Sequence, residues 1–179
     1  AVIAQPLVTQ PVQLAQPLSQ RAQMVGALGQ GLLGLGVQGV NVGAAVTPEA
    51  DLVGPVLAKF EVKVKAGAQF FQTQAVYHPD VFAGFMKQVR PFNVKVLAGI
   101  LLLRNAKMAE FMNANIPGMS VPSEMIDELK AAGDKAEDVG VDIAVRTIKA
   151  VRPHCDGVHI MAIKATHRLA EIITKAELD

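Results

Sequence analysis

This chain of 179 residues has one cysteine, no tryptophan and almost no net charge, and each of these features argues against a class of protein. The single cysteine, Cys155, leaves neither a disulfide framework nor a four-cysteine zinc site. A formal net charge of +1 argues against a protein that coats nucleic acid. Aromatic side chains make up only 4% of the chain, which disfavours a platform on which bases or sugars stack.

The front of the chain is almost free of charge, because Arg21 is the only charged residue before Glu49. Glutamine, asparagine and glycine interrupt this stretch, so we expect no membrane-spanning helix, which needs about 20 mostly apolar residues. The start also lacks the basic segment of a signal peptide. With 51% hydrophobic residues, the sequence predicts a single cytoplasmic globular domain over residues 1–179.

Short apolar runs alternate with amphipathic segments along the chain. The expected strands cover residues 1–4, 40–46, 69–76, 94–101 and 156–163. The expected helices cover residues 47–65, 78–90, 105–112, 122–132, 134–151 and 166–175. Thr47, Pro48 and Glu49 favour a helix start, as cap, first helical residue and partner of the helix dipole. The alternation predicts parallel β-α-β units, and both doubly wound sheets and barrels fit it.

Several short motifs have an ordinary structural explanation. Residues 29–34 match the glycine pattern of a dinucleotide-binding loop, but no strand is expected directly before them. The four histidines lack the i, i+4 spacing of a helical zinc site, so no metal site is expected. His154 and Asp156 flank Cys155, but neighbours on a strand point to opposite faces, so we interpret Cys155 as a small buried hydrophobe.

Three segments offer more specific chemistry. Gln74 lies late in an expected parallel strand, where such folds bind ligands, and its amide suits a heterocycle such as a pterin or a backbone partner. Lys59 and Lys63 share a helix face and either hold a phosphate or are simply solvated. Met161 and Ile163 share a face of the last strand and pack either on a flat cofactor ring or in the core.

Five motifs follow one another along the chain. They are Lys63-Val-Lys-Ala-Gly-Ala68, Phe70-Phe-Gln-Thr-Gln74, Leu97-Ala-Gly-Ile100, Ile116-Pro-Gly118 with Val121-Pro122, and Gly157-Val-His-Ile-Met-Ala-Ile163. In this order and spacing they resemble the methylenetetrahydrofolate reductase family, and the last motif is similar to its bacterial, often anaerobic, branch. The resemblance covers residues 41–179, whereas residues 1–40 match the family poorly.

The resemblance implies a (β/α)8 barrel, of which this chain has only the second half with about five strands. It also implies a flavin, FAD rather than FMN, at the carboxyl ends of the strands. The implied reaction is the reduction of 5,10-methylenetetrahydrofolate to 5-methyltetrahydrofolate in one-carbon metabolism. Either NAD(P)H or an electron-donating partner protein would supply the electrons.

The resemblance also implies roles for individual residues. Gln74 would contact the folate pterin, Lys63 the phosphate portion of the flavin, and the last strand, with His159, Met161 and Ile163, would line the flavin. The family's glutamate on its first strand and the aspartate of its Thr-Gly-Asp motif have no counterpart here, so no catalytic residue is assigned. An arginine contact after the last strand is missing too, because the sequence there is Met-Ala-Ile-Lys-Ala.

Three interpretations therefore remain open. The chain is a flavin-dependent reductase or part of one, a non-catalytic subunit or fragment of such a reductase complex, or an unrelated α/β barrel that binds a phosphorylated ligand. Because half of a barrel exposes unpaired strand edges, we expect an oligomer or a complex with another chain.

Overall fold

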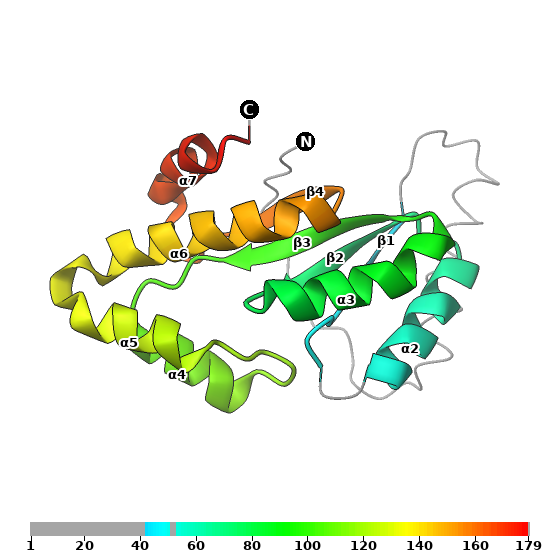
Figure 1. Cartoon of the computed structure of the whole chain (residues 1–179), viewed down its shortest axis with the longest axis horizontal. Helices are drawn as coiled ribbons and strands as arrows, with labels where there is room; N and C mark the ends of the chain where they lie inside the picture. Colours follow the sequence, from blue (N-terminus) through cyan, green and yellow to red (C-terminus); the bar gives the residue numbers. More distant parts are fainter. Residues whose placement is uncertain (1–41, 51–52, 179) are drawn as a thin grey trace.

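Four parallel strands form the centre of the computed structural model, which describes residues 42–50 and 53–178. The strands are β1 (Gly43–Val46), β2 (Phe70–Ala75), β3 (Lys95–Leu101) and β4 (Gly157–Met161). They lie side by side in the order of the chain, and each neighbouring pair is parallel (Figure 1). The predicted strand at residues 1–4 and the glycine pattern at residues 29–34 lie outside the described residues.

Helices connect successive strands. They are α2 (Val53–Lys65), α3 (Pro79–Val89), α4 (Ala106–Asn115), α5 (Ser123–Ala131), α6 (Ala136–Val151) and α7 (Leu169–Ala176). Single-turn 3-10 helices cover Arg90–Phe92, Gly133–Lys135, Arg152–His154 and Thr166–Arg168. Of these elements, α2, α3 and α6 return the chain to the amino ends of the strands. In contrast, α4 and α5 extend beyond the carboxyl end of β3, at the left of Figure 1.

The core lies between one face of the sheet and the helices. On this face, Phe71 stacks on Phe60 of α2 with ring centroids 3.9 Å apart. The buried side chains of alternate residues on β3 and β4 continue the same layer against α3 and α6. Because the strands follow one another in order and the crossovers have one hand, the helices cover a single face. The described strand order does not reverse, as that of a doubly wound sheet does at its switch point.

The amphipathic pattern predicted for residues 134–151 is confirmed by α6. Its Ala136, Gly140, Ile143 and Thr147 are all buried. A Cβ atom at Gly140 would lie 1.8 Å from the carbonyl oxygen of Leu103, so the helix packs directly on the backbone that follows β3. The glycine on this helix stripe is therefore required by close packing.

Some element boundaries differ from the sequence prediction. Residues 47–50, where a helix was predicted to start, are not helical, and the Glu49 carboxylate accepts hydrogen bonds from residues 28 and 29 positions away. The last strand ends at Met161, where its pairing with β3 ends, and not at Ile163. A turn follows, in which Lys164 adopts a left-handed conformation with φ of 56°.

Candidate functional site

Three predicted ligand contacts, Gln74, His159 and Met161, lie in the carboxyl halves of β2 and β4, which β3 separates. Gln74 is the residue before the end of β2, and Met161 is the last residue of β4. Ala75 pairs with Gly99 of β3, and Gly99 pairs with His159 of β4. Gln74 and His159 are thus two strand spacings apart, or about 10 Å. Since ligand-binding residues of parallel α/β folds lie at this end of the strands, these residues define the candidate site.

The face that the helices leave uncovered carries these side chains. In β2 the buried Phe71 and Thr73 alternate with the half-buried Gln72 and Gln74. In β4, Val158 belongs to the core cluster between sheet and helices, and Ile160 packs against it. Because side chains alternate along a strand, His159 and Met161 point to the opposite face of the sheet. Side chains of β2 and β4 therefore share the face of the sheet opposite this core cluster.

A bulge in β2 sets the backbone at Gln74. The pairing of β2 with β3 shifts between Gln72 and Ala75. The Thr73 hydroxyl donates a hydrogen bond to the Gln74 carbonyl (2.7 Å) and accepts one from the amide of Gly99 (2.8 Å). A Cβ atom at residue 99 would lie 2.4 Å from the Thr73 carbonyl oxygen. The bulge thus needs a hydroxyl at position 73 and a glycine at position 99, and it links two of the sequence motifs.

On the β4 side the site is apolar and holds a neutral imidazole. His159 is half-buried, and burial lowers the pKa of its ring, so the ring is uncharged at pH 7. Met161 pairs with Leu101 and packs against the second core cluster, which α4, α5 and α6 complete. Ile163 follows the strand and is 52% exposed, so it does not share a strand face with Met161 as predicted.

Lys63 lies elsewhere, at the edge of β1 that pairs with no other strand of the described residues. Its ammonium group donates a hydrogen bond to the carbonyl oxygen of Ala45. The Val42 carbonyl points toward β2, because it accepts a hydrogen bond from the backbone amide of Gln69. Successive carbonyls along a strand point to opposite sides, so the Ala45 carbonyl, three residues later, points away from β2. Burial, and then the charge of Lys59, lower the pKa of Lys63. Among the described hydrogen bonds, none brings Lys63 to Gln74, His159 or Met161.

Glu49, which the sequence predicted only as a helix-start residue, is a partly buried acid at this end of the sheet. One carboxylate oxygen accepts hydrogen bonds from the backbone amides of Tyr77 (2.8 Å) and His78 (2.7 Å), which follow β2. The other oxygen is buried and has no hydrogen-bond partner within the described part of the chain. Burial raises the pKa of Glu49 despite the opposing effect of these bonds and of the His78 charge.

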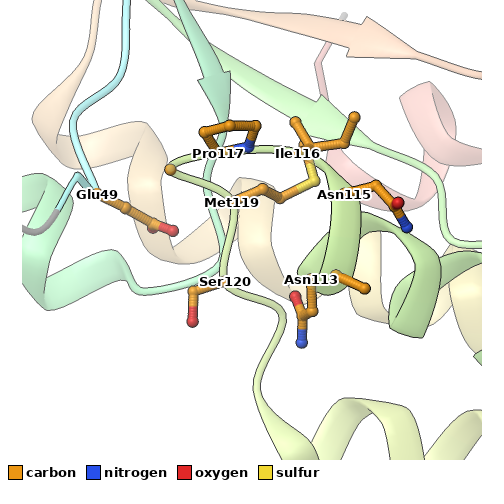
Figure 2. Close-up of a pocket in the computed structure, with 9 residues that line it drawn as sticks. Glu49, Asn113, Asn115, Ile116, Pro117, Met119 and Ser120 are labelled. Carbon is orange, nitrogen blue, oxygen red and sulfur yellow. The ribbon is translucent and has the colours of Figure 1, made fainter.

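A pocket of about 380 Å³ lies next to Glu49, between it and the turn after α4. Figure 2 shows Glu49 facing residues 116–120, with Asn113 and Asn115 at the end of α4. The side-chain Nδ2 of Asn113 donates a hydrogen bond to the backbone carbonyl of Val121 (2.9 Å), and its Oδ1 accepts one from the backbone amide of Val121 (2.7 Å). These two bonds fix the turn. The sequence prediction missed this pocket. The available signal was that Glu49 directly follows a strand, where α/β folds place ligand contacts.

The same turn contacts the loops after β1 and β2. A Cβ atom at Gly118 would lie 2.6 Å from the Thr47 methyl group, so the turn packs closely on the loop after β1. The His78 ring, through Nε2, donates to the Ser120 carbonyl at 3.0 Å. The strand-to-helix connections after β1 and β2 and the turn between α4 and α5 therefore meet near Glu49.

Over residues 42–50 and 53–178, no three histidine, cysteine, aspartate or glutamate side chains are grouped so as to hold a metal ion. None of the helices in these ranges has both the length and the apolar character needed to cross a membrane. Cys155 is only partly buried and packs against the edge of the core, and burial raises the pKa of its thiol.

Comparison with known proteins agrees with the motifs. Residues 36–177 match the family model described as methylenetetrahydrofolate reductase, starting slightly before the predicted limit at residue 41. The chain is also 30% identical over 135 residues to Methylenetetrahydrofolate reductase 2 of Schizosaccharomyces pombe. That match covers 65% of this chain and 21% of the yeast protein, so the chain spans about a fifth of the length of this relative. The chain belongs to the methylenetetrahydrofolate reductase family.

Proposed function

We propose that this chain takes part in the flavin-dependent reduction of 5,10-methylenetetrahydrofolate to 5-methyltetrahydrofolate, as a cytoplasmic oxidoreductase of one-carbon metabolism. The observation that carries the proposal is that Gln74, His159 and Met161 lie near the carboxyl ends of β2 and β4, two parallel strands that β3 separates. Membership of the family supports a folate reaction. The electrons come from NAD(P)H or from a partner protein.

Gln74 is the proposed contact of the folate pterin. Its amide offers one acceptor and two donors on a short, planar group, which matches the alternating donors and acceptors of a pterin edge. The Gln74 side chain is half-buried. Among the described residues, the backbone carbonyl of Gln74 accepts a side-chain hydrogen bond, whereas its side-chain amide makes none. The bulge holds this backbone through Thr73 and so limits where the amide can reach.

The accessible face of β4 fits a flavin, which we propose is FAD. Met161 and the uncharged His159, both partly exposed, offer an apolar contact with one polar ring, as the flat flavin ring requires. Ile163, exposed directly after β4, is a further proposed contact. When bound, the flavin supplies the hydride chemistry, and the protein orients the folate against it.

Lys63 is the proposed partner of the flavin phosphate. Burial and the neighbouring Lys59 both disfavour its charge, and a bound phosphate would offset both effects. To reach a phosphate, the ammonium has to share or leave the Ala45 carbonyl. Lys63 would therefore link the backbone of β1 at Ala45 to the proposed cofactor site.

We further propose that the sheet is the second half of a (β/α)8 barrel. The sequential strand order and the helices on one face support this. Within the described residues, β1 and β4 each pair with one strand only, and such edges favour association with further strands. The chain would then act within an oligomer or a complex.

The test is a pair of glutamine substitutions in β2. With the flavin-loaded protein, Gln74→Ala should weaken binding of 5-methyltetrahydrofolate by about 5- to 150-fold, because a buried polar partner is lost, at about 1–3 kcal/mol. Gln72→Ala, on the same strand and face but further from its carboxyl end, is the matched control and should change the dissociation constant less than about twofold. Calorimetric titration measures both.

Equal affinities of the wild type and Gln74→Ala would contradict the role of Gln74. A protein that binds no added FAD but associates stably with another chain would favour the second candidate, a non-catalytic subunit of the same complex. The edge of β1, which pairs with no further strand among the described residues, is the observation that supports this candidate.

A further inference from the structure

Glu49 connects the two parts of the proposed site. It follows β1, whose Ala45 carbonyl holds Lys63, and it binds the backbone that follows Gln74 at the end of β2. The flavin-phosphate side and the folate side are thus joined through one carboxylate. Neither sequence motifs nor family comparison assigns this residue a role.

The two amides that Glu49 binds are at the start of α3. His78 is the residue before this helix, and its own side chain gives no capping hydrogen bond. Free amides at a helix start need an acceptor, which a carbonyl or carboxyl oxygen can supply. Glu49 supplies that acceptor from a different loop, which fixes the position of the helix start and of the strand end before it.

This arrangement is poor for stability. The second carboxylate oxygen of Glu49 is buried without a partner in the described part of the chain, and so is the Tyr77 hydroxyl. A buried and incompletely paired polar group lowers stability, and residues of this kind are typical of functional sites. The arrangement therefore points to a positional role for Glu49.

We propose that Glu49 is a positioning residue for folate reduction, which acts by fixing Gln74 relative to the flavin-phosphate side of the site. The proposal rests on the proposed function. The active feature is the reach of one side-chain oxygen to the amides of Tyr77 and His78, and not the negative charge. The turn at residues 116–120 closes over this contact through the His78–Ser120 hydrogen bond.

Two substitutions separate reach from charge. Glu49→Gln keeps an oxygen at the same distance from the backbone and removes the charge, so it should bind 5-methyltetrahydrofolate within about threefold of the wild type. Glu49→Asp keeps the charge but is one methylene shorter, so it should weaken binding about tenfold or more. Circular dichroism establishes that both variants are folded, and the flavin-loaded protein is titrated by calorimetry.

A double-mutant cycle distinguishes positioning from general damage. If Glu49 acts through Gln74, Glu49→Asp should change folate affinity less than about twofold in the Gln74→Ala background. Asp156→Ala is the matched control, because Asp156 also accepts a backbone amide, at the opposite end of the sheet. It should lower stability and leave folate affinity unchanged.

The proposal is overturned if Glu49→Gln is as damaging as Glu49→Asp, or if the effects of residues 49 and 74 are additive. It is also overturned if Asp156→Ala weakens folate binding equally. The failure of the proposed function is distinguishable, because then Gln74→Ala alone would leave the folate affinity unchanged.

Discussion

The two ends of the sheet each use one partly buried carboxylate, and they use it differently. At the amino end, Asp156 accepts the Val96 amide (3.0 Å) and also pairs with Arg90 (2.9 Å) and Lys95 (3.3 Å). At the carboxyl end, Glu49 accepts two amides, but its second oxygen has no partner in the described part of the chain. Burial opposes ionisation at Asp156 too, but the amide, Lys95 and Arg90 outweigh it and lower its pKa.

The comparison shows what each end is arranged to do. A fully paired carboxylate stabilises the fold, whereas an incompletely paired one lowers stability in exchange for a fixed geometry. This matches the general division in barrels, where the amino ends of the strands provide stability and the carboxyl ends carry the chemistry.

Two glycines repeat the contrast between the ends. At the amino end of β4, a Cβ atom on Gly157 would meet only the end of the Leu97 side chain, at 2.9 Å. In the carboxyl half of β3, a Cβ atom on Gly99 would meet the carbonyl oxygens of Thr73 (2.4 Å) and Gln74 (2.8 Å). A side chain can turn aside, but the backbone of the bulge cannot do so without moving Gln74.

The largest expected effect is therefore that of Gly99→Ala. It should lower the free energy of unfolding by about 1–3 kcal/mol, because the added methyl group overlaps backbone atoms. Gly157→Ala should stay within about 1 kcal/mol of the wild type, since strand propensity offsets the shift of Leu97. Urea unfolding at pH 7 measures both. Equal losses for the two variants would remove the contrast between the two ends.

Removing the charges of the two acids should have a smaller effect, and only at one end. Asp156→Asn should lower stability at pH 7 by about 1–2 kcal/mol, because the attraction to Arg90 and Lys95 is lost. Glu49→Gln should change stability by less than about 1 kcal/mol or increase it, because a buried charge disappears. The same unfolding experiment compares them, and a larger loss for Glu49→Gln would contradict the account.

The smallest effect is a difference in pH dependence. The pKa of Asp156 is lowered from 3.8, so its stabilising contribution is present above pH 3.8 and is lost as the pH falls through the lowered value. The pKa of Glu49 is raised from 4.5, so its favourable contribution is present below pH 4.5 and is lost as the pH rises through the raised value.

Between pH 4.5 and the raised pKa of Glu49, the wild type should therefore lose stability relative to Glu49→Gln as the pH rises. Over the same range, the difference between the wild type and Asp156→Asn should stay constant. Unfolding curves at several pH values test both statements. A constant difference between the wild type and Glu49→Gln would show that the Glu49 pKa is not raised.

Local patterns predicted the sheet and its helices well. The apolar runs that became β2, β3 and β4 are buried on at least one face, and the stripe on α6 is buried as expected. These features depend on the spacing of apolar residues, which a sequence displays directly. The positions of Gln74, His159 and Met161 followed from the same patterns and from the family resemblance.

The features that sequence reasoning missed depend on contacts between distant residues. Glu49 resembled a helix-start residue, but its partners are 28 and 29 positions away. The strand end at Met161 depends on where β3 ends, and no local signal marks it. The bond between Thr73 and Gly99, 26 positions apart, likewise shows two separate motifs to be one structural unit.

The most direct test of the central claim, that the carboxyl end of the sheet holds the folate site, is an amide NMR titration of the FAD-loaded protein with 5-methyltetrahydrofolate. The account predicts shift changes at Gln74, at residues 77–78 and at residues 159–161, with none at Val96 or Asp156. Changes centred on the amino end of the strands, or no changes at saturating folate, would contradict it.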